Sequence, residues 1–198
     1  MAAITNSAFE LRVSNHMFDT TKNITGKFQN STPADELCAA GFLVVPGTKL
    51  DNEGYSSVKN ENAYLMGAAD TATAEHLYAC NTFNVQELTD AFGNAYKVGS
   101  NVLGLAVPAG QRGTYTRIDE GDMMRFGIGN FTTAISTNGY ATLGTSTNAG
   151  KLVPAASAPT TTGALYFEIV ESGKFTQGAY AAFDYVLVKA HRVHTVAG

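Results

Sequence analysis

The sequence predicts a mostly β protein, either an antiparallel β-sandwich or a barrel of jelly-roll-like form, with an extended N-terminal arm. Two observations of composition and one of pattern predict this fold class. Only 15% of the 198 residues are charged, 20 residues are glycine, and threonine and asparagine are frequent. β-Branched threonine suits strands, whereas glycine and asparagine suit tight turns. The apolar residues occur in short runs bounded by turn residues, which is typical of many short strands.

Residues 1–35 are expected to form an arm that becomes ordered against a partner, because the segment is polar and its apolar residues follow no clean period. Its candidate partner contacts are Phe9, Leu11, Val13 and Phe18. An alternative stays open, because the apolar positions of residues 9–13 alternate and would equally suit a first strand. Residues 36–198 are expected to form the β domain.

Buried strands are expected at the start of this domain. Residues 37–45 form a continuous apolar run closed by Pro46 and Gly47, which is typical of a strand buried on both faces. Residues 63–69 and 76–83 are apolar again. Between them, a single helical turn capped by Asp70-Thr71 and a continued strand are both compatible with the sequence.

Tight turns are expected at three places. Gly93-Asn94 can take the positive φ angles of a hairpin that joins residues 85–88 to 96–98. The tetrapeptide Asp119-Glu-Gly-Asp122 separates two further strand patterns and is expected to be the turn between two paired strands. Ser172-Gly173 would supply a third hairpin turn, after residue 170.

Residues 144–163 are rich in Thr, Ser, Ala, Gly and Pro and are expected to form a long exposed loop that packs only at Leu152-Val153. The strand pattern that follows places Leu165, Phe167 and Ile169 on one face. Tyr166, Glu168 and Val170 then lie on the other face of that strand.

The last strand pattern, residues 183–193, is apolar on both sides. Tyr185 and Leu187 share one face, and Val186 and Val188 share the other. A strand buried on both faces belongs in the middle of a sheet or at an oligomer interface. These four residues are therefore the candidates for the core or oligomer strand.

Charge and composition argue against several partners. The net charge is −4 and the 13 Lys and Arg are scattered, which is unlike a nucleic-acid-binding protein. No stretch approaches the roughly 20 apolar residues of a membrane helix, and the N-terminus lacks the pattern of a secretory signal. We expect neither a nucleic acid nor a membrane partner, and synthesis in a cytoplasm. Cys38 and Cys80 are expected to be reduced core residues.

Few residues offer catalytic or metal-binding chemistry, so we expect neither an enzyme nor a cofactor. His191 and His194 are three residues apart, and on a strand such residues point to opposite faces and cannot share a metal. Asp119, Glu120 and Asp122 provide oxygens for a cation, but the twelve-residue calcium-loop pattern is absent. A turn explains the three acidic residues more simply.

Several long strings in the last two thirds of the chain resemble a family of small proteins in tailed phages of Gram-positive gut bacteria. They are AADTATAEHLYACNTFNVQEL, GNAYKVGSNVLGLAVPAGQRGTYTRIDEGDMMRFGIGNF, NGYATLG and TTGALYFEIVESGKFTQGAYAAFDYVLVKA. That family is connected with head genes near the major capsid protein. The resemblance therefore implies a decoration or cement protein that binds the major capsid protein on the surface of the virion.

A cement protein of this kind would stabilise the shell through contacts made only after assembly, and it would be a homo-oligomer, with a trimer favoured. Two other classes stay open. One is a tail, baseplate or head-fibre protein whose loop at residues 144–163 meets a host receptor. The other is a carbohydrate-active β protein, which the absence of Trp disfavours because sugars usually stack on exposed aromatic rings.

Overall fold

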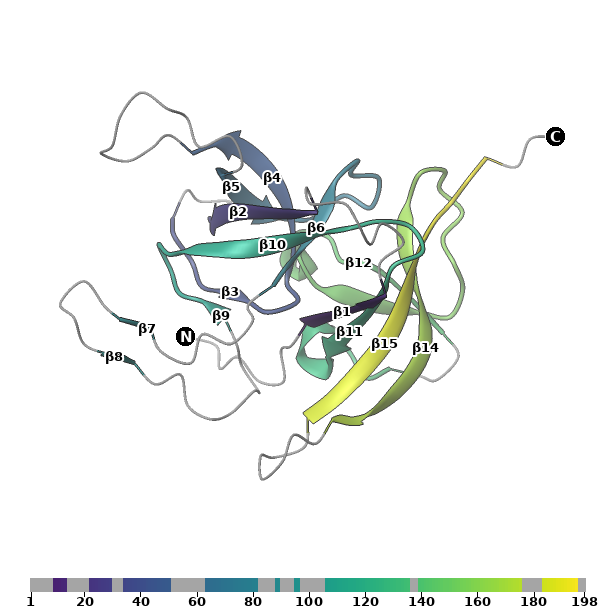
Figure 1. The fold of residues 1–198 in the computed structure, drawn as a ribbon. Helices are drawn as coiled ribbons and strands as arrows, with labels where there is room; N and C mark the ends of the chain where they lie inside the picture. The colour runs from purple at the N-terminus through teal and green to yellow at the C-terminus, as the bar shows by residue number, and fades with distance from the viewer. Residues whose placement is uncertain are drawn as a thin grey trace.

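The computed structural model describes residues 9–13, 22–29, 34–50, 63–81, 88–89, 95–96, 106–135, 139–175 and 183–195. These residues form fifteen strands and two short 3₁₀-helices, η1 (Ile128–Asn130) and η2 (Ser146–Asn148). The predicted mostly β fold is confirmed, and it combines a closed barrel with an antiparallel sheet (Figure 1). No helix in these parts of the chain is long and apolar enough to cross a membrane.

The larger sheet has six strands in the order β1-β11-β15-β14-β12-β13, and all neighbouring strands are antiparallel. Residues 183–193 were predicted to lie in the middle of a sheet or at an oligomer interface, and the first is confirmed, since strand β15 is third in this order. The strands are β1 (Phe9–Val13), β11 (Met123–Gly127), β12 (Tyr140–Leu143), β13 (Leu152–Ala155), β14 (Leu165–Phe175) and β15 (Phe183–Arg192).

The barrel closes in the order β10-β2-β5-β4-β6, with β2 and β5 parallel and the other pairs antiparallel. Because it is closed, the barrel has no free strand edge. Its strands are β2 (Asn23–Phe28), β4 (Leu43–Lys49), β5 (Ala63–Ala68), β6 (Leu77–Cys80) and β10 (Arg112–Ile118).

Two short strand pairs complete the fold. Strand β3 (Cys38–Ala39) pairs with β9 (Ala106–Val107), and β7 (Leu88–Thr89) pairs with β8 (Ala95–Tyr96). The second pair confirms the strand pairing expected around Gly93-Asn94, although the turn residues themselves lie outside the described residues.

The barrel is inserted between two neighbouring strands of the sheet. The chain leaves the sheet after β1, forms the barrel strands from β2 to β10, and returns to the sheet at β11, which pairs with β1. The expected boundary at residue 35 is therefore wrong for β2, which is a barrel strand and not part of an arm. The alternative of a first strand at Phe9–Val13 is confirmed. The pattern alone could not reveal that β2 finds its partners far along the chain.

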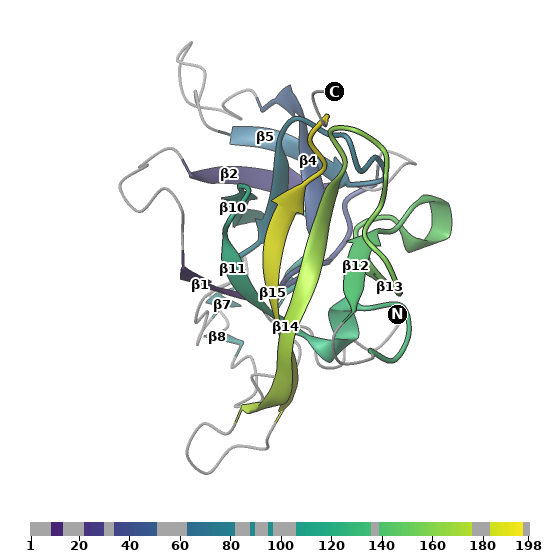
Figure 2. The same cartoon turned by 90° about the vertical axis from the view of Figure 1, so that its right-hand side faces the viewer.

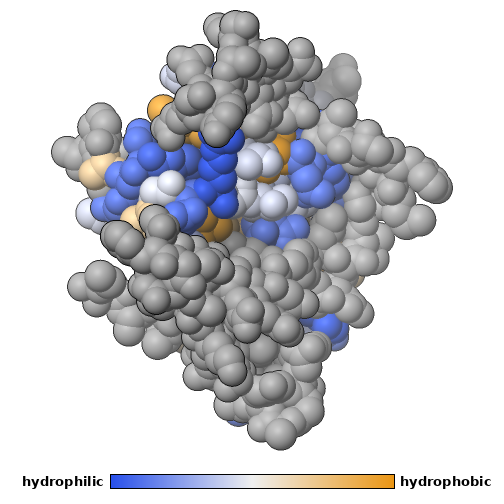
Figure 3. Space-filling view, turned by 60° about the vertical axis from the view of Figure 1, so that its left-hand side comes forward, coloured by the Kyte–Doolittle hydropathy of each residue, from blue (hydrophilic) through white to orange (hydrophobic). Residues whose placement is uncertain are grey.

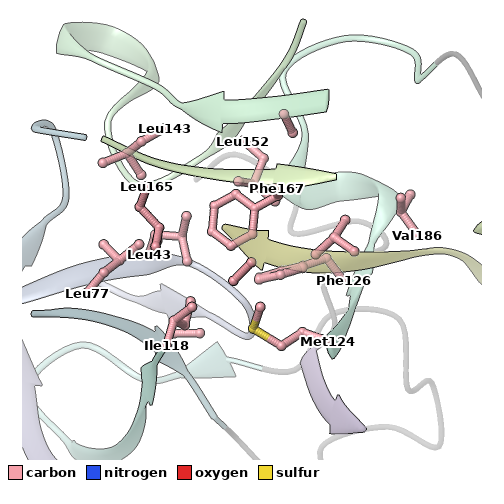
Figure 4. Close-up of a cluster of buried hydrophobic side chains, with 14 of the residues drawn as sticks. Leu43, Leu77, Ile118, Met124, Phe126, Leu143, Leu152, Leu165, Phe167 and Val186 are labelled. Atoms are coloured by element: carbon pink, nitrogen blue, oxygen red, sulfur yellow. The ribbon is translucent and has the colours of Figure 1, made fainter. Parts of the chain in front are cut away.

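Two hydrophobic clusters hold these parts together. The first lies between the sheet and one side of the barrel, and Figure 4 shows Phe126 and Phe167 of the sheet beside Leu43 of β4. The second fills the barrel and includes Val44 and Tyr115. Leu43 and Val44 are neighbours in one strand, so their side chains point to opposite sides and each faces a different cluster. The barrel wall is thus buried on both sides where it meets the sheet.

The continuous apolar run at residues 37–45 is two strands rather than one. Strands β3 and β4 belong to different sheets and are separated by a turn at Gly41, whose φ is 77°. Strand β4 then continues through Pro46 and Gly47, where the register with β5 is irregular. Residues 71–76 form turns and bends, neither the helical turn nor the strand.

Two expected turns turned out differently. Strand β14 runs straight through Ser172-Gly173, because Gly173 leaves room for the ring of Tyr185 on the neighbouring strand. The acidic segment at Asp119–Asp122 is a turn, with Gly121 at φ 89°, but the strands on either side do not pair. Instead this turn carries the chain from the barrel to the sheet.

The segment at residues 144–163 is only partly an exposed loop. It contains η2 and the edge strand β13, whose Leu152 is fully buried. Gly150 has a φ angle of 79°, and its backbone lies against the ring of Phe42. A residue with a side chain would collide with that ring. Backbone hydrogen bonds of Gly150 with Leu43 and Ala69 join this segment to the barrel.

Candidate interaction surface

The two faces of the six-stranded sheet differ in burial. The inner face packs on the barrel, and its central residues Val186 and Val188 are buried. The outer face carries the alternate residues, which are half-buried or exposed. Figure 2 turns this face to the viewer, with β14 and β15 in front and no described strand lying over them. The outer face is therefore a sheet surface that no described strand covers (Figure 2).

Aromatic side chains line one end of the outer face. Tyr166 of β14 and His191 of β15 are directly opposed in the register, and their rings stack with centroids 5.3 Å apart at 19°. Tyr140 of β12 packs edge-on with Tyr166, with centroids 5.9 Å apart. His191 Nε2 is 2.9 Å from a carboxylate oxygen of Glu168. These contacts fix the rings across three strands.

A second group of side chains occupies the other end of the outer face. The guanidinium of Arg125 lies 4.6 Å from the ring centroid of Tyr185, which is a cation-π contact. The Tyr185 hydroxyl donates a hydrogen bond of 2.9 Å to the Glu171 carboxylate. This bond, with a smaller contribution from burial, raises the pKa of the Tyr185 phenol above its ordinary value.

Between these groups a β-bulge exposes a hydrophobic side chain. The register of β14 against β15 shifts between Ile169 and Glu171, and Val170 is the extra residue. Bulges re-aim side chains. Val170 is 45% exposed, and among the described residues only Leu37 is another large hydrophobic residue of similar exposure. The outer face thus has an apolar projection between its aromatic ends.

The predicted core strand is confirmed in its position and corrected in its burial. Val186 and Val188 face the core, whereas Tyr185 and Leu187 lie on the outer face and are half-buried. The strand is therefore buried fully on one face and partly on the other.

The predicted partner contacts in the N-terminal segment have different outcomes. Phe9 is buried in the core, with its ring centroid 5.3 Å from that of Phe126, so it is unavailable to a partner. Leu11 and Val13 belong to β1. Phe18 lies outside the described residues.

The acidic turn holds a lysine ammonium. Lys22 Nζ donates hydrogen bonds to Asp122 Oδ2 at 2.6 Å and to Asp119 Oδ2 at 3.2 Å, and both Lys22 and Asp122 are buried. The Asp119 N–H also donates to Asp122 Oδ2, at 2.8 Å. Lys22 stands where the chain enters the barrel, and the turn is where it leaves. The ion cluster therefore joins the two points at which the chain passes between the sheet and the barrel, and we call this place the neck of the barrel.

Neighbouring charges complete this cluster. Partial burial acts to raise the pKa of Asp119, but the hydrogen bond from Arg117 and the charge of Lys22 outweigh it, so the pKa lies below its ordinary value. His194 is 2.9 Å from Glu120, and this hydrogen bond lowers the pKa of Glu120. Within the described residues, no group of three or more His, Cys, Asp and Glu could hold a metal ion.

The histidines and cysteines have separate surroundings. His191 lies on β15 and His194 follows its end, and they pair with different carboxylates, those of Glu168 and Glu120. Cys38 and Cys80 are free, buried thiols in the barrel cluster, which confirms the expected reduced core residues. Burial, reinforced by Cys80, raises the pKa of Cys38 well above its ordinary value. Such a thiol is a poor nucleophile.

Sequence reasoning missed the bulge on the outer face and the lysine of the ion cluster. Alternation in residues 165–170 already placed Tyr166, Glu168 and Val170 on the face away from the core, but it gave no sign of the register shift at Val170. Lys22 carried no local signal, because its partners lie about 100 positions away in the chain.

Comparison with family models, with curated proteins and with solved structures finds no match to this chain.

Proposed function

We propose that the chain is a virion structural subunit that decorates or cements the outside of a tailed-phage capsid, bound to the major capsid protein. The outer face of the six-stranded sheet carries this proposal, together with the sequence resemblance. Its side chains include Tyr, Arg, Met and Leu, which are common at protein interfaces. The barrel and inner face are filled by core side chains, so the outer face is the surface on which a neighbouring protein subunit would dock.

The packing of the aromatic rings favours a protein partner over a sugar. A sugar stacks on a free ring face, whereas one face of Tyr166 is already occupied by His191. The Tyr185 ring is likewise engaged by Arg125. Rings held in this way offer edges and hydroxyl groups, which suit the mixed apolar and polar contacts of a protein interface.

Cement action follows from mass action. A subunit that binds only the assembled shell stabilises it by a free energy that grows with the concentration of free subunit over the dissociation constant. The closed barrel has no free strand edge that would pair with the wrong neighbour, and in the described fold the open sheet edges are the short strands β1 and β13.

Co-sedimentation of the purified protein with capsids that lack it tests the proposal. We expect saturable binding to the capsids and a rise in their temperature of disruption. Replacing Tyr166 by Ala removes the centre of the aromatic group and should weaken binding, whereas Lys27→Ala on the barrel should not. Failure of the unaltered protein to bind capsids would contradict the proposal. Binding to isolated tails would favour the tail or fibre alternative.

A further inference from the structure

The outer face of the sheet combines an apolar projection with strips of opposite charge. Lys189 of β15 and Glu168 of β14 are directly opposed in the register of the two strands. Arg125 adds positive charge on the β11 side of β15, and Glu171 adds negative charge on β14. The β15 strip and the neighbouring Arg125 are therefore positive, and the β14 strip is negative.

We propose that this face binds a second copy of the chain about a two-fold axis. An axis parallel to the strands, between β14 and β15, superposes the β15 strip of one copy on the β14 strip of the other. Lys189 of each copy then faces Glu168 of its mate. A two-fold interface must be complementary to itself, and this arrangement of charge meets that condition twice.

The bulge supplies the apolar centre of the same interface. Val170 projects from β14 close to the proposed axis, and Leu187 lies half-buried on the facing strand. Interfaces commonly have an apolar centre surrounded by polar and aromatic residues. Tyr166 and Tyr185 stand at the two ends of this centre. Val170 thus gives the outer face an exposed apolar residue between its polar and aromatic ends.

The side of the molecule turned away from the sheet shows no large hydrophobic patch among its described residues (Figure 3). Figure 3 views the molecule from the side opposite the sheet, and the described residues that show there are mainly hydrophilic, with hydrophobic residues only as small separate spots. Leu37, which precedes β3, is the other exposed large hydrophobic residue in the described part of the chain. It provides a control for exposure alone.

This inference shares with the proposed function only the outer face, for which a second copy and the capsid would compete, so self-association is measured on the free protein without capsids. Sedimentation equilibrium should show a dimer of the unaltered protein. Val170→Asp should weaken the dimer about tenfold or more, because it places a charge at the centre of the interface. Leu37→Asp, which adds the same charge at an equally exposed site, should leave the dimer unchanged.

Charge reversal gives a test that only contact between two copies can satisfy. Lys189→Glu makes the face negative and Glu168→Lys makes it positive, so each variant alone should be monomeric. Mixed in equal amounts, the two variants should form a heterodimer. A monomeric unaltered protein, a trimer, or a mixture that stays monomeric while both variants remain folded would overturn the two-fold interface. Capsid binding by such a monomer would leave the proposed function intact.

Discussion

Lys22 is almost fully buried, although lysine is among the side chains that proteins bury least. It is tolerated because two carboxylates surround its ammonium group, one of them on the fully buried Asp122. The backbone carbonyl of Lys22 also accepts a hydrogen bond of 2.7 Å from the Arg117 N–H, beside the turn. In the sequence, Lys22 lies in a polar stretch, and such a lysine is expected to be exposed to solvent. Burial of a charge depends on partners brought by the fold, so this residue could not be predicted.

Lys22→Met should strongly destabilise the protein, because the Asp122 carboxylate would remain buried without its counter-ion. Removing one partner of a buried ion pair costs about 3 to 5 kcal/mol. Lys27→Met is the matched control, since Lys27 lies on β2, which directly follows Lys22, and pairs at 2.7 Å with Asp35 where both side chains are partly exposed. Urea unfolding should show a large loss for the first variant and little change for the second. Equal losses of unfolding free energy in the two variants would contradict a special stabilising role of the ion cluster at the neck.

Strand elements differ in how far the sequence predicts them. Alternation predicted the faces of residues 165–170, and apolar residues on both faces predicted the place of residues 183–193, because these patterns are local. Ser172-Gly173 was misread, since a glycine that admits a neighbouring ring and a glycine that makes a turn look alike in one sequence. The parallel pairing of β2 with β5 depends on contacts between distant segments, which no local pattern contains.

Gly150→Ala should be more destabilising than Gly163→Ala. Both glycines have positive φ angles, 79° and 80°, which cost a residue with a side chain about 1 to 2 kcal/mol. An added Cβ at Gly163 meets no atom within 4 Å, whereas at Gly150 it collides with the Phe42 ring. The difference in unfolding free energy between the variants measures that collision. Equal losses would show that the joint between β13 and the barrel can adjust.

The central strand β15 should respond differently on its two faces. Val186→Asp puts a charge into the core and should prevent cooperative folding, since an unpaired buried charge costs several kcal/mol, roughly. Leu187→Asp alters the outer face and should leave a folded protein with weakened self-association. Thermal unfolding followed by circular dichroism separates the two outcomes. Loss of folding in both variants would mean that the outer face is also core.

At the scale of the whole molecule, the barrel is inserted in the chain between two neighbouring strands of the sheet. The ion cluster of Lys22, Asp119 and Asp122 holds the two connections together at the neck. The mostly β class was predictable from composition and turn residues, because these follow from local preferences of the backbone. The insertion of the barrel was not predictable in this way, since a boundary at residue 35 assumed that the segment containing β1 and β2 was separate from the β domain. The proposed role as a capsid subunit depends on the outer sheet face, whose character appears only after the strands are placed in register.

Locating the chain in purified phage particles by electron cryo-microscopy tests the proposed function most directly. The account predicts density for the barrel and sheet on the outside of the head, repeated with the symmetry of the shell and contacting the major capsid protein. Density at the tail, baseplate or a fibre, or no density in the particle at all, would contradict it.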